Sequence, residues 1–122
     1  MDIAVDFDGT VVTHEYPNVG EDVENAVNTL HKMVHAGYNI IINTMRSGKE
    51  LADAIEWYNT RGIKLYGVNV NPTQHKWTSS PKVYAQISID DINFGCPVRW
   101  QNGHRVVDWF EIERELFGKK MI

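Results

Sequence analysis

The sequence predicts an α/β fold built around a parallel sheet, and two observations indicate it. Short apolar runs alternate with segments of helical periodicity, in the order strand, helix, strand, helix, strand, loop, strand, hairpin, helix. Alternating strands and helices favour parallel strands joined by right-handed crossovers. Acidic or hydroxyl residues also follow most of the predicted strands directly. With 122 residues and no linker-like stretch, residues 1–122 are expected to form a single domain.

The first half of the chain predicts two strands and a helix. Residues 3–5 form a short apolar run that leads into the polar turn of residues 6–10. Apolar side chains then recur at helical spacing over residues 23–34, and Gly37 stands where a helix commonly ends. Residues 38–42 predict a second buried strand.

The middle of the chain predicts a helix, a third strand and a loop. Ser47 and Glu50 have the spacing of a capping box, which indicates a helix that begins there and closes near Gly62. Residues 65–70 predict the third strand. Residues 71–81 are rich in Pro, Thr and Ser, which is typical of a loop.

The last third predicts a fourth strand, a hairpin and a final helix. The strand covers residues 85–89 and ends at the acidic pair Asp90 and Asp91. Asn102 and Gly103 lie between two apolar runs, which is a strong hairpin signal. Asp108 suits the start of the helix that follows.

Composition limits the classes of function. The net charge of −4 implies no strongly basic surface for nucleic acid or for an acidic membrane. The single cysteine, Cys96, excludes an internal disulfide and fits a reducing compartment. The longest purely apolar runs are a few residues, whereas a membrane-spanning helix needs about 20. We therefore expect a cytoplasmic protein without a membrane partner.

Acidic residues close several of the predicted strands. In parallel α/β sheets, ligands bind at the carboxyl ends of the strands. Asp6, Asp8, Thr44, Asp90 and Asp91 all fall there. Clustered carboxylates repel one another unless a cation lies between them, and an all-oxygen site suits Mg²⁺. The sequence therefore predicts a magnesium site at this edge of the sheet.

The spacing of Asp6 and Asp8 suits two different chemical roles. At an extended strand end, side chains two residues apart face the same side. One carboxylate can bind the metal and attack phosphorus, giving an acyl phosphate, while the other moves a proton at the bridging oxygen. Gly9 allows a sharp turn and is expected to present its N–H to a phosphoryl oxygen.

These motifs resemble those of the haloacid dehalogenase-like phosphatase superfamily. Residues 6–10, Asp-Phe-Asp-Gly-Thr, match its first motif, and Thr44 matches the Thr or Ser that closes the next strand. Lys82 is the best-placed candidate for the third motif, with Lys76 as its competitor. Asp90 and Asp91 match the acidic pair of the fourth motif. The matched pattern spans most of the chain.

The resemblance implies a role for each matched residue. Asp6 would be the nucleophile and Asp8 the general acid/base, while Thr44 would bond the phosphoryl group and Lys82 would hold its charge. Substrate contacts are expected from three further residues: Gly9, Thr10 and Arg46. Mg²⁺ would be held by a set of four acids: Asp6, Asp8 (through its backbone carbonyl), Asp91 and its helper Asp90.

The resemblance also implies an architecture: a three-layer, Rossmann-like sheet with helices on both faces and a C-terminal hairpin plus helix. The gaps at residues 10–38 and 70–82 are too short for a cap domain. Water exclusion is therefore expected from the flap, residues 11–19, from the substrate, or from a second subunit of a homo-oligomer. The expected substrate is a phosphate monoester of a small metabolite, a nucleotide or a nucleic-acid end.

Four alternatives stay open beside this phosphatase. A receiver-like phosphoacceptor is disfavoured because the third strand ends in Asn69, Val70 and Asn71, with no Asp. A regulatory module that binds phosphate and Mg²⁺ without turnover is a second alternative. A phosphotransferase and a dehalogenase are the others, since one fold hosts several chemistries.

Overall fold

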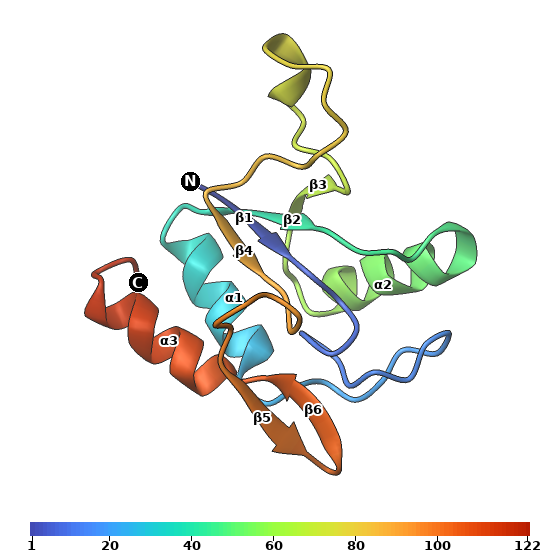
Figure 1. Cartoon of the computed structure of the whole chain (residues 1–122), viewed down its shortest axis with the longest axis vertical. Coiled ribbons are helices and arrows are strands. Elements are labelled where there is room, and N and C mark those ends of the chain that lie inside the picture. The colour runs from blue at the N-terminus through green and yellow to red at the C-terminus, as the bar shows by residue number, and fades with distance from the viewer.

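The computed structural model describes all 122 residues and shows an α/β fold (Figure 1). Its elements follow the predicted order: β1 (Asp2–Val5), α1 (Ala26–His35), β2 (Asn39–Ile42), α2 (Gly48–Thr60), β3 (Leu65–Val68), the 3₁₀ turn η1 (Gln74–Lys76), β4 (Ile87–Ile89), β5 (Val98–Gln101), β6 (His104–Val107) and α3 (Trp109–Gly118). The predicted α/β class, hairpin and final helix are confirmed.

The four main strands form one parallel sheet in the order β3-β2-β1-β4. Val5 at the end of β1 pairs with Ile42 of β2 and Ile89 of β4. The residues that follow these three strands therefore leave the sheet at the same edge. Since β1 is central, Asp6 emerges between the end of β2 and the end of β4.

All three helices contribute to a single core. The side chains of Ile3 and Val5 from β1, and of Ile40 and Ile42 from β2, are fully buried in it together with residues of α1, α2 and α3. Ala4 lies between Ile3 and Val5, so its side chain faces the other side of the sheet; it is buried but outside this core. The expected helical layer on the opposite face is therefore not seen.

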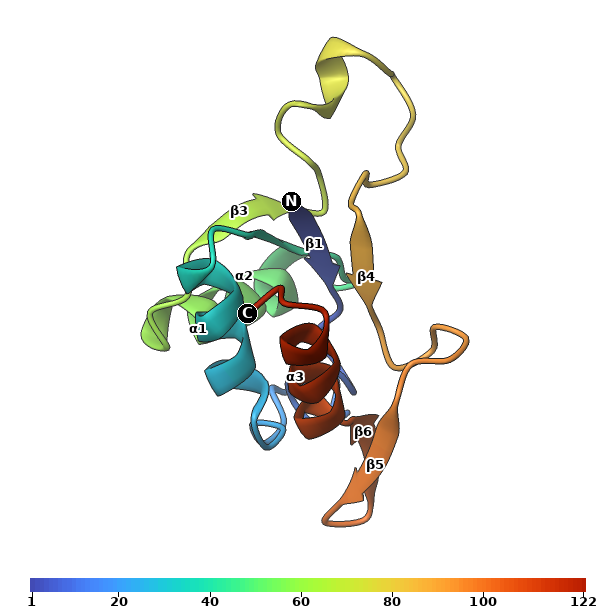
Figure 2. The ribbon, with the colours of Figure 1, turned by 90° about the vertical axis from the view of Figure 1, so that its left-hand side faces the viewer.

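The segment between β3 and β4 forms an arm, residues 70–86, that projects from the sheet (Figures 1 and 2). It contains no helix longer than η1. Asn71, which is buried, donates from Nδ2 to Asp2 Oδ2 at 2.8 Å and to the carbonyl of Tyr84 at 3.0 Å. Because Asp2 begins β1, the arm is attached at the amino end of that strand.

The flap is closed at its base by Thr13 and Glu21. The Thr13 N–H donates to the Glu21 carbonyl at 2.8 Å, and the Glu21 N–H donates to Thr13 Oγ1 at 2.9 Å. Gly20 lies against this pair, and a Cβ there would stand 2.1 Å from the Thr13 carbonyl oxygen. Only glycine fits this crossing of the two chain segments.

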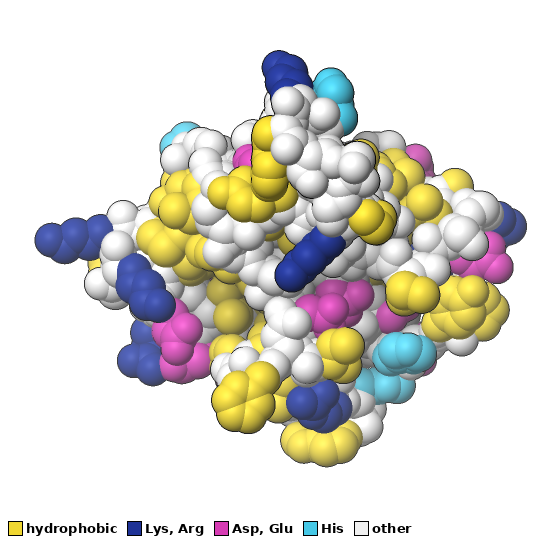
Figure 3. Space-filling model, turned by 45° about the horizontal axis from the view of Figure 1, so that its top comes forward, with side chains coloured by type: hydrophobic (Ala, Val, Ile, Leu, Met, Phe, Trp, Pro, Cys, Tyr) yellow, Lys and Arg dark blue, Asp and Glu magenta, His cyan; other side chains and the backbone are white.

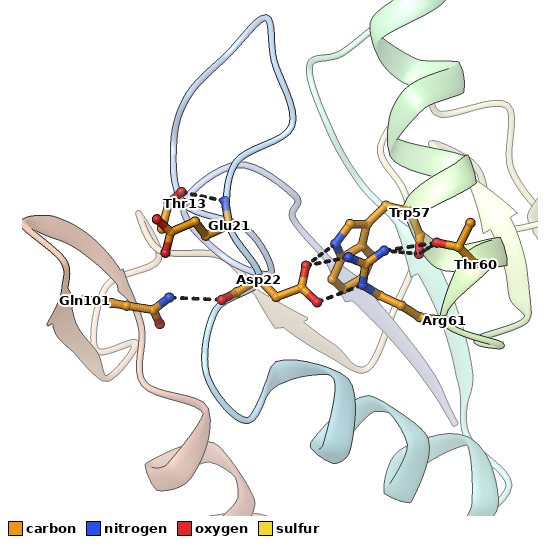
Figure 4. Close-up of polar contacts among 7 residues, drawn as sticks. All are labelled: Thr13, Glu21, Asp22, Trp57, Thr60, Arg61 and Gln101. Carbon is orange, nitrogen blue, oxygen red and sulfur yellow. Dashed lines mark hydrogen bonds and ion pairs between the residues drawn. The ribbon is translucent and has the colours of Figure 1, made fainter.

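Asp22 fastens the end of the flap to α2 and to the hairpin (Figure 4). Its carboxylate accepts hydrogen bonds from Trp57 Nε1 at 2.7 Å and from Arg61 Nε and Nη2 at 2.8 and 2.7 Å. Arg61 also lies over the Trp57 ring, 4.4 Å from its centroid. Gln101 donates to the Asp22 carbonyl at 2.9 Å. The flap is thus held to two separate elements.

Some local expectations were wrong in detail. The Ser47 hydroxyl makes no capping bond, although α2 begins directly after it. β3 ends at Val68 rather than residue 70, because Asn69 has φ +54° and turns the chain away from the sheet.

No helix is long and apolar enough to cross a membrane.

Candidate functional site

Three carboxylates meet at the carboxyl edge of the sheet. Asp6 follows β1, and Asp90 and Asp91 follow β4; each offers an oxygen, and these oxygens lie within 4.8 Å of one another. The Asp6 N–H donates to the Ile89 carbonyl at 2.9 Å, which extends the pairing of β1 with β4 to the site. Partly buried oxygen ligands at this spacing fit a hard divalent cation such as Mg²⁺.

Thr10 orients two of these acids. Its hydroxyl donates to Asp6 Oδ2 at 2.8 Å and accepts from the Asp91 N–H at 3.3 Å. Thr10 is fully buried, and its carbonyl accepts a hydrogen bond from Trp109 Nε1 at 2.6 Å. The expected substrate contact through Thr10 is therefore not seen: the side chain is enclosed and positions the acids.

The electrostatics of the cluster disfavour three negative charges. Burial raises the pKa of Asp6 from its ordinary 3.8 to about 7, and the charges of Asp90 and Asp91 add to the rise, although the Thr10 hydrogen bond opposes it. Burial and the neighbouring Asp90 likewise raise the pKa of Asp91. Without a cation, a proton is therefore retained by these acids near neutral pH.

Asp8 does not join the cluster, because its carboxylate is paired with Arg46. Arg46 Nε donates to Asp8 Oδ2 at 2.8 Å and Nη2 donates to Asp8 Oδ1 at 2.7 Å. This bidentate contact raises the pKa of Arg46 above its ordinary value. The structure thus brings the Asp8 side chain to the same hollow but not among the candidate metal ligands.

Arg46 is not available to a substrate. It is only 2% exposed, and its remaining N–H groups donate to three carbonyls: those of Pro17 and Asn18 in the flap and of Glu50 in α2. The guanidinium also lies over the Phe7 and Tyr16 rings. With all five N–H groups bonded, Arg46 joins Asp8 to the flap and to α2. Arg46 lines the hollow as expected, but a direct substrate contact stays a prediction that would require it to give up one of these bonds.

Gly9 contributes close packing rather than a free N–H. Its N–H already donates to the Val12 carbonyl at 2.8 Å, so the expected phosphoryl contact is not seen. Its φ of +79° lies in the left-handed region, and a Cβ there would stand 2.7 Å from Asp91 Oδ2. Glycine thus lets the first motif approach the Asp91 carboxylate.

The carboxylates lie in a hollow of about 500 Å³. Its other lining residues are of mixed character: His14, Tyr16, Thr44, Met45, Arg46 and Ile92. Met45 and Ile92 are 99% and 81% exposed, so the rim carries unpacked apolar side chains. One face of the molecule shows such a mixture, with acidic side chains near the centre and hydrophobic and histidine side chains around them (Figure 3).

Thr44 lies in the hollow as the sequence predicts. Its N–H donates to Asn69 Oδ1 at 2.8 Å, and its hydroxyl accepts from the Arg46 N–H at 3.1 Å. The Thr44 hydroxyl keeps its own proton to donate, since no acceptor for it is present in the structure. A hydroxyl donor at this edge suits an incoming oxyanion.

The structure does not bring Lys82 to the hollow. Lys82 is exposed on the arm, and it lines a different, smaller hollow with Gln74, Trp77 and Tyr84. Gln74 Nε2 donates to the Lys82 carbonyl at 2.6 Å, which ties Lys82 to the arm. The arm itself is attached at the amino end of β1. The acidic cluster lies at the opposite, carboxyl ends of the strands, so the predicted contact between Lys82 and the carboxylates is absent. Its competitor, Lys76, belongs to the same arm.

Sequence reasoning missed Arg105, which contacts Asp91 from beside the hollow although it does not line it. From β6, its Nη1 donates to the Asp91 carbonyl at 3.2 Å and stands 3.9 Å from Asp91 Oδ2. The hairpin reaches the site because the Val107 N–H donates to the Gly9 carbonyl at 3.1 Å. This contact joins residues nearly a hundred positions apart in the sequence, so no local sequence pattern predicts it.

A larger hollow of about 980 Å³ lies elsewhere, between α1 and α3. It is lined by apolar and basic side chains, including Phe110, Phe117 and His35, and Glu113 is its one carboxylate, paired with Lys32 at 2.7 Å. No cluster of metal-ligating groups lies there. The candidate functional site is therefore the smaller, acidic hollow.

The fold and site define a small α/β protein with an acidic centre at the carboxyl edge of a parallel sheet. No model of a known protein family matches the sequence, and no curated protein matches it. A solved structure of a conserved protein from Bacteroides thetaiotaomicron is similar, with 37% sequence identity and a TM-score of 0.81. The match covers 98% of this chain and 91% of that one. The chain belongs to the family of that conserved protein.

Proposed function

We propose that this protein is a Mg²⁺-dependent phosphatase of the haloacid dehalogenase-like class that acts through a phosphorylated Asp6. The observation that carries the proposal is the meeting of Asp6 with Asp90 and Asp91 within 4.8 Å at the end of the central strands. A carboxylate that faces two others in a partly buried hollow is suited to share a cation and to face an anionic ester.

The first chemical step would be taken by Asp6. One of its carboxylate oxygens attacks phosphorus, the ester P–O bond breaks, and the leaving oxygen takes a proton from the carboxylic acid of Asp8. Thr10 holds the other Asp6 oxygen, so the reacting oxygen is oriented. The Thr44 hydroxyl donates to a phosphoryl oxygen.

The second step would release phosphate. The Asp8 carboxylate takes a proton from water as the water oxygen attacks phosphorus, and the bond to Asp6 breaks. Mg²⁺ held by Asp6, Asp90 and Asp91 would offset the negative charge shared by the acids and the phosphate. Both steps require the Asp8 carboxyl to be released from Arg46, whose contacts also hold the flap.

Turnover of a generic aryl phosphate tests the proposal. We expect hydrolysis that requires Mg²⁺, is lost with EDTA, and falls at least a thousandfold in Asp6→Asn. Beryllofluoride should form an adduct at Asp6 that protein mass spectrometry or fluorine NMR detects. Asp53→Asn is the matched control, because Asp53 is paired with Lys49 on the surface of α2 and does not line the hollow.

Two results would contradict the proposal. Robust turnover by Asp6→Asn would remove the covalent mechanism. Absence of turnover over a panel of phosphorylated metabolites, nucleotides and nucleic-acid ends would contradict the phosphatase activity. If the same preparation still bound Mg²⁺, the proposed metal site would stand.

The Asp8–Arg46 contact favours a second candidate. With both Asp8 oxygens bonded, Asp6 can accept a phosphoryl group while water activation is slow. Such a protein would be a phosphotransferase or a phosphate-sensing module rather than a fast hydrolase. A stable phosphorylated Asp6, isolated after incubation with acetyl phosphate and Mg²⁺, would favour this candidate over the phosphatase.

The proposal extends to setting and substrate. The single Cys96 and the absence of a strongly basic overall charge fit a cytoplasmic enzyme acting on a small phosphorylated metabolite or nucleotide. The exposed Met45 and Ile92 at the rim suit a substrate whose alcohol part carries apolar surface.

A further inference from the structure

The acidic hollow is lined by one guanidinium, that of Arg46, and all of its N–H groups are already bonded within the protein. Three carboxylates and one divalent cation leave a net negative charge, and a phosphate monoester dianion adds two more. The lysine expected to offset this charge, Lys82, lies on the arm and outside the hollow. Another cation must take its place if the site is to bind phosphate.

Two guanidinium groups contact acids of the site. Arg46 contacts Asp8, and Arg105 contacts Asp91. Arg46 has all its N–H groups bonded within the protein, so it cannot turn to a ligand without losing them. Arg105 makes only one hydrogen bond, to the Asp91 carbonyl, and its side chain is 48% exposed.

We propose that Arg105, presented by the β5–β6 hairpin, binds the phosphoryl group of the substrate in place of the lysine. This inference rests on the proposed function and names the residue that recognises its anionic part. Arg105 Nη1 stands 3.9 Å from Asp91 Oδ2, which is too long for a strong pair and leaves four N–H groups free. A planar guanidinium can place two of them on two phosphoryl oxygens.

Two hydrogen bonds from residues that follow Arg105 hold the end of β6 at the site. The Val107 N–H donates to the Gly9 carbonyl at 3.1 Å, and Trp109, just after the hairpin, donates to the Thr10 carbonyl at 2.6 Å. These bonds fix β6 against the turn that carries Asp6. The Arg105 side chain is 48% exposed and bonded only to the Asp91 carbonyl, so it has room to turn toward a phosphate beside Asp91.

Binding of inorganic phosphate in the presence of Mg²⁺ tests the role without relying on turnover. Isothermal titration calorimetry should show that Arg105→Met binds phosphate at least tenfold more weakly than the wild-type protein does. Mg²⁺ affinity, titrated without phosphate, should stay the same or rise up to threefold, because the substitution removes a positive charge beside Asp91. The two ligands therefore respond differently to one change.

Arg99→Met is the matched control, since Arg99 lies in the same hairpin but is paired with Glu24 at 3.1 Å and lies over Phe110. It should change neither affinity by more than twofold. Lys82→Met should likewise leave phosphate affinity within twofold. Arg105→Lys should recover part of the phosphate affinity, because a lysine restores the charge but not the two-pronged geometry.

Several outcomes would overturn the inference. Phosphate affinity that is unchanged in Arg105→Met, or lost instead in Lys82→Met, excludes Arg105 as the phosphate ligand. Equal losses of Mg²⁺ and phosphate affinity would make Arg105 a structural support of Asp91. Wild-type protein that binds phosphate through Arg105 but hydrolyses no ester would contradict the proposed function alone, so the two failures are distinguishable.

Discussion

The guanidinium of Arg46 donates to both carboxylate oxygens of Asp8, at 2.8 Å from Nε and 2.7 Å from Nη2, and it does so in an almost fully buried position. The same guanidinium holds two flap carbonyls, those of Pro17 and Asn18. The acid expected to move protons and the segment expected to shield the site are therefore joined through one side chain. Release of Asp8 would leave the Arg46 guanidinium without its carboxylate partner while it still holds the flap carbonyls.

This arrangement predicts a large loss of stability in Arg46→Met. Removing one partner of a buried ion pair leaves the other charge uncompensated, which costs about 3–5 kcal/mol. Urea unfolding, with Mg²⁺ absent, should show that decrease in the free energy of unfolding. The double variant Asp8→Asn/Arg46→Met should recover part of it, since no buried charge is then left without a partner.

Arg114→Met serves as the control for that measurement. Arg114 is paired with Glu111 within one turn of α3, and its side chain is mostly exposed. Such surface pairs contribute less than about 1 kcal/mol. If Arg46→Met costs no more than Arg114→Met, the buried network does not hold the flap as described.

The parts of the site that the sequence predicts are those fixed by local patterns. Buried apolar runs set which residues end β1, β2 and β4, so Asp6, Thr44 and Asp90 fall at one edge of the sheet as expected. Asn-Gly at 102–103 fixes the hairpin by its turn preference. Each of these features depends on a few neighbouring residues.

The remaining features depend on contacts between distant segments. The sequence around Arg46 does not show that its N–H groups donate to the carbonyls of Pro17, Asn18 and Glu50. The loop predicted over residues 71–81 was correct, but its attachment to Asp2, which carries Lys82 away from the acids, is a tertiary contact. The resemblance implied helices on both faces, whereas the composition of that loop already predicted none between β3 and β4.

The stability of the metal-free protein should fall as the pH rises from about 5 to about 7. Burial raises the pKa of Asp6 from 3.8 to about 7, so the native state holds this proton more tightly than the unfolded chain. Between the two values, raising the pH removes a proton that stabilises the fold. At about 1.4 kcal/mol for each unit of pH, the loss between pH 5 and pH 7 is at most about 3 kcal/mol.

Urea unfolding at pH 5, 6, 7 and 8 with EDTA measures this slope. Asp6→Asn should flatten the slope over the same window and should be more stable than wild type at pH 8, because an amide carries no charge toward Asp90 and Asp91. Asp53→Asn should leave the slope unchanged. A wild-type protein whose stability rises from pH 5 to pH 7 contradicts the raised pKa.

Mg²⁺ affinity should rise with pH, because the metal displaces the proton held by Asp6. With a pKa of about 7, nine-tenths of Asp6 is protonated at pH 6 and about one-tenth at pH 8, so the apparent affinity should increase about tenfold between them. Calorimetric titrations in buffers of different ionisation enthalpy should detect the released proton. An affinity that is independent of pH, with no proton release, would place the metal elsewhere.

Gly9→Ala should weaken the metal centre by displacing Asp91. A Cβ at residue 9 would stand 2.7 Å from Asp91 Oδ2, and the φ of +79° adds backbone strain for any L residue. We expect Mg²⁺ affinity to fall at least tenfold.

Gly37→Ala separates the two effects, because Gly37 has φ +95° with nothing within 4 Å of an added Cβ. It should lose about 1 kcal/mol of stability and keep its Mg²⁺ affinity. Equal Mg²⁺ losses in both variants would show that backbone strain, and not the contact with Asp91, controls the site.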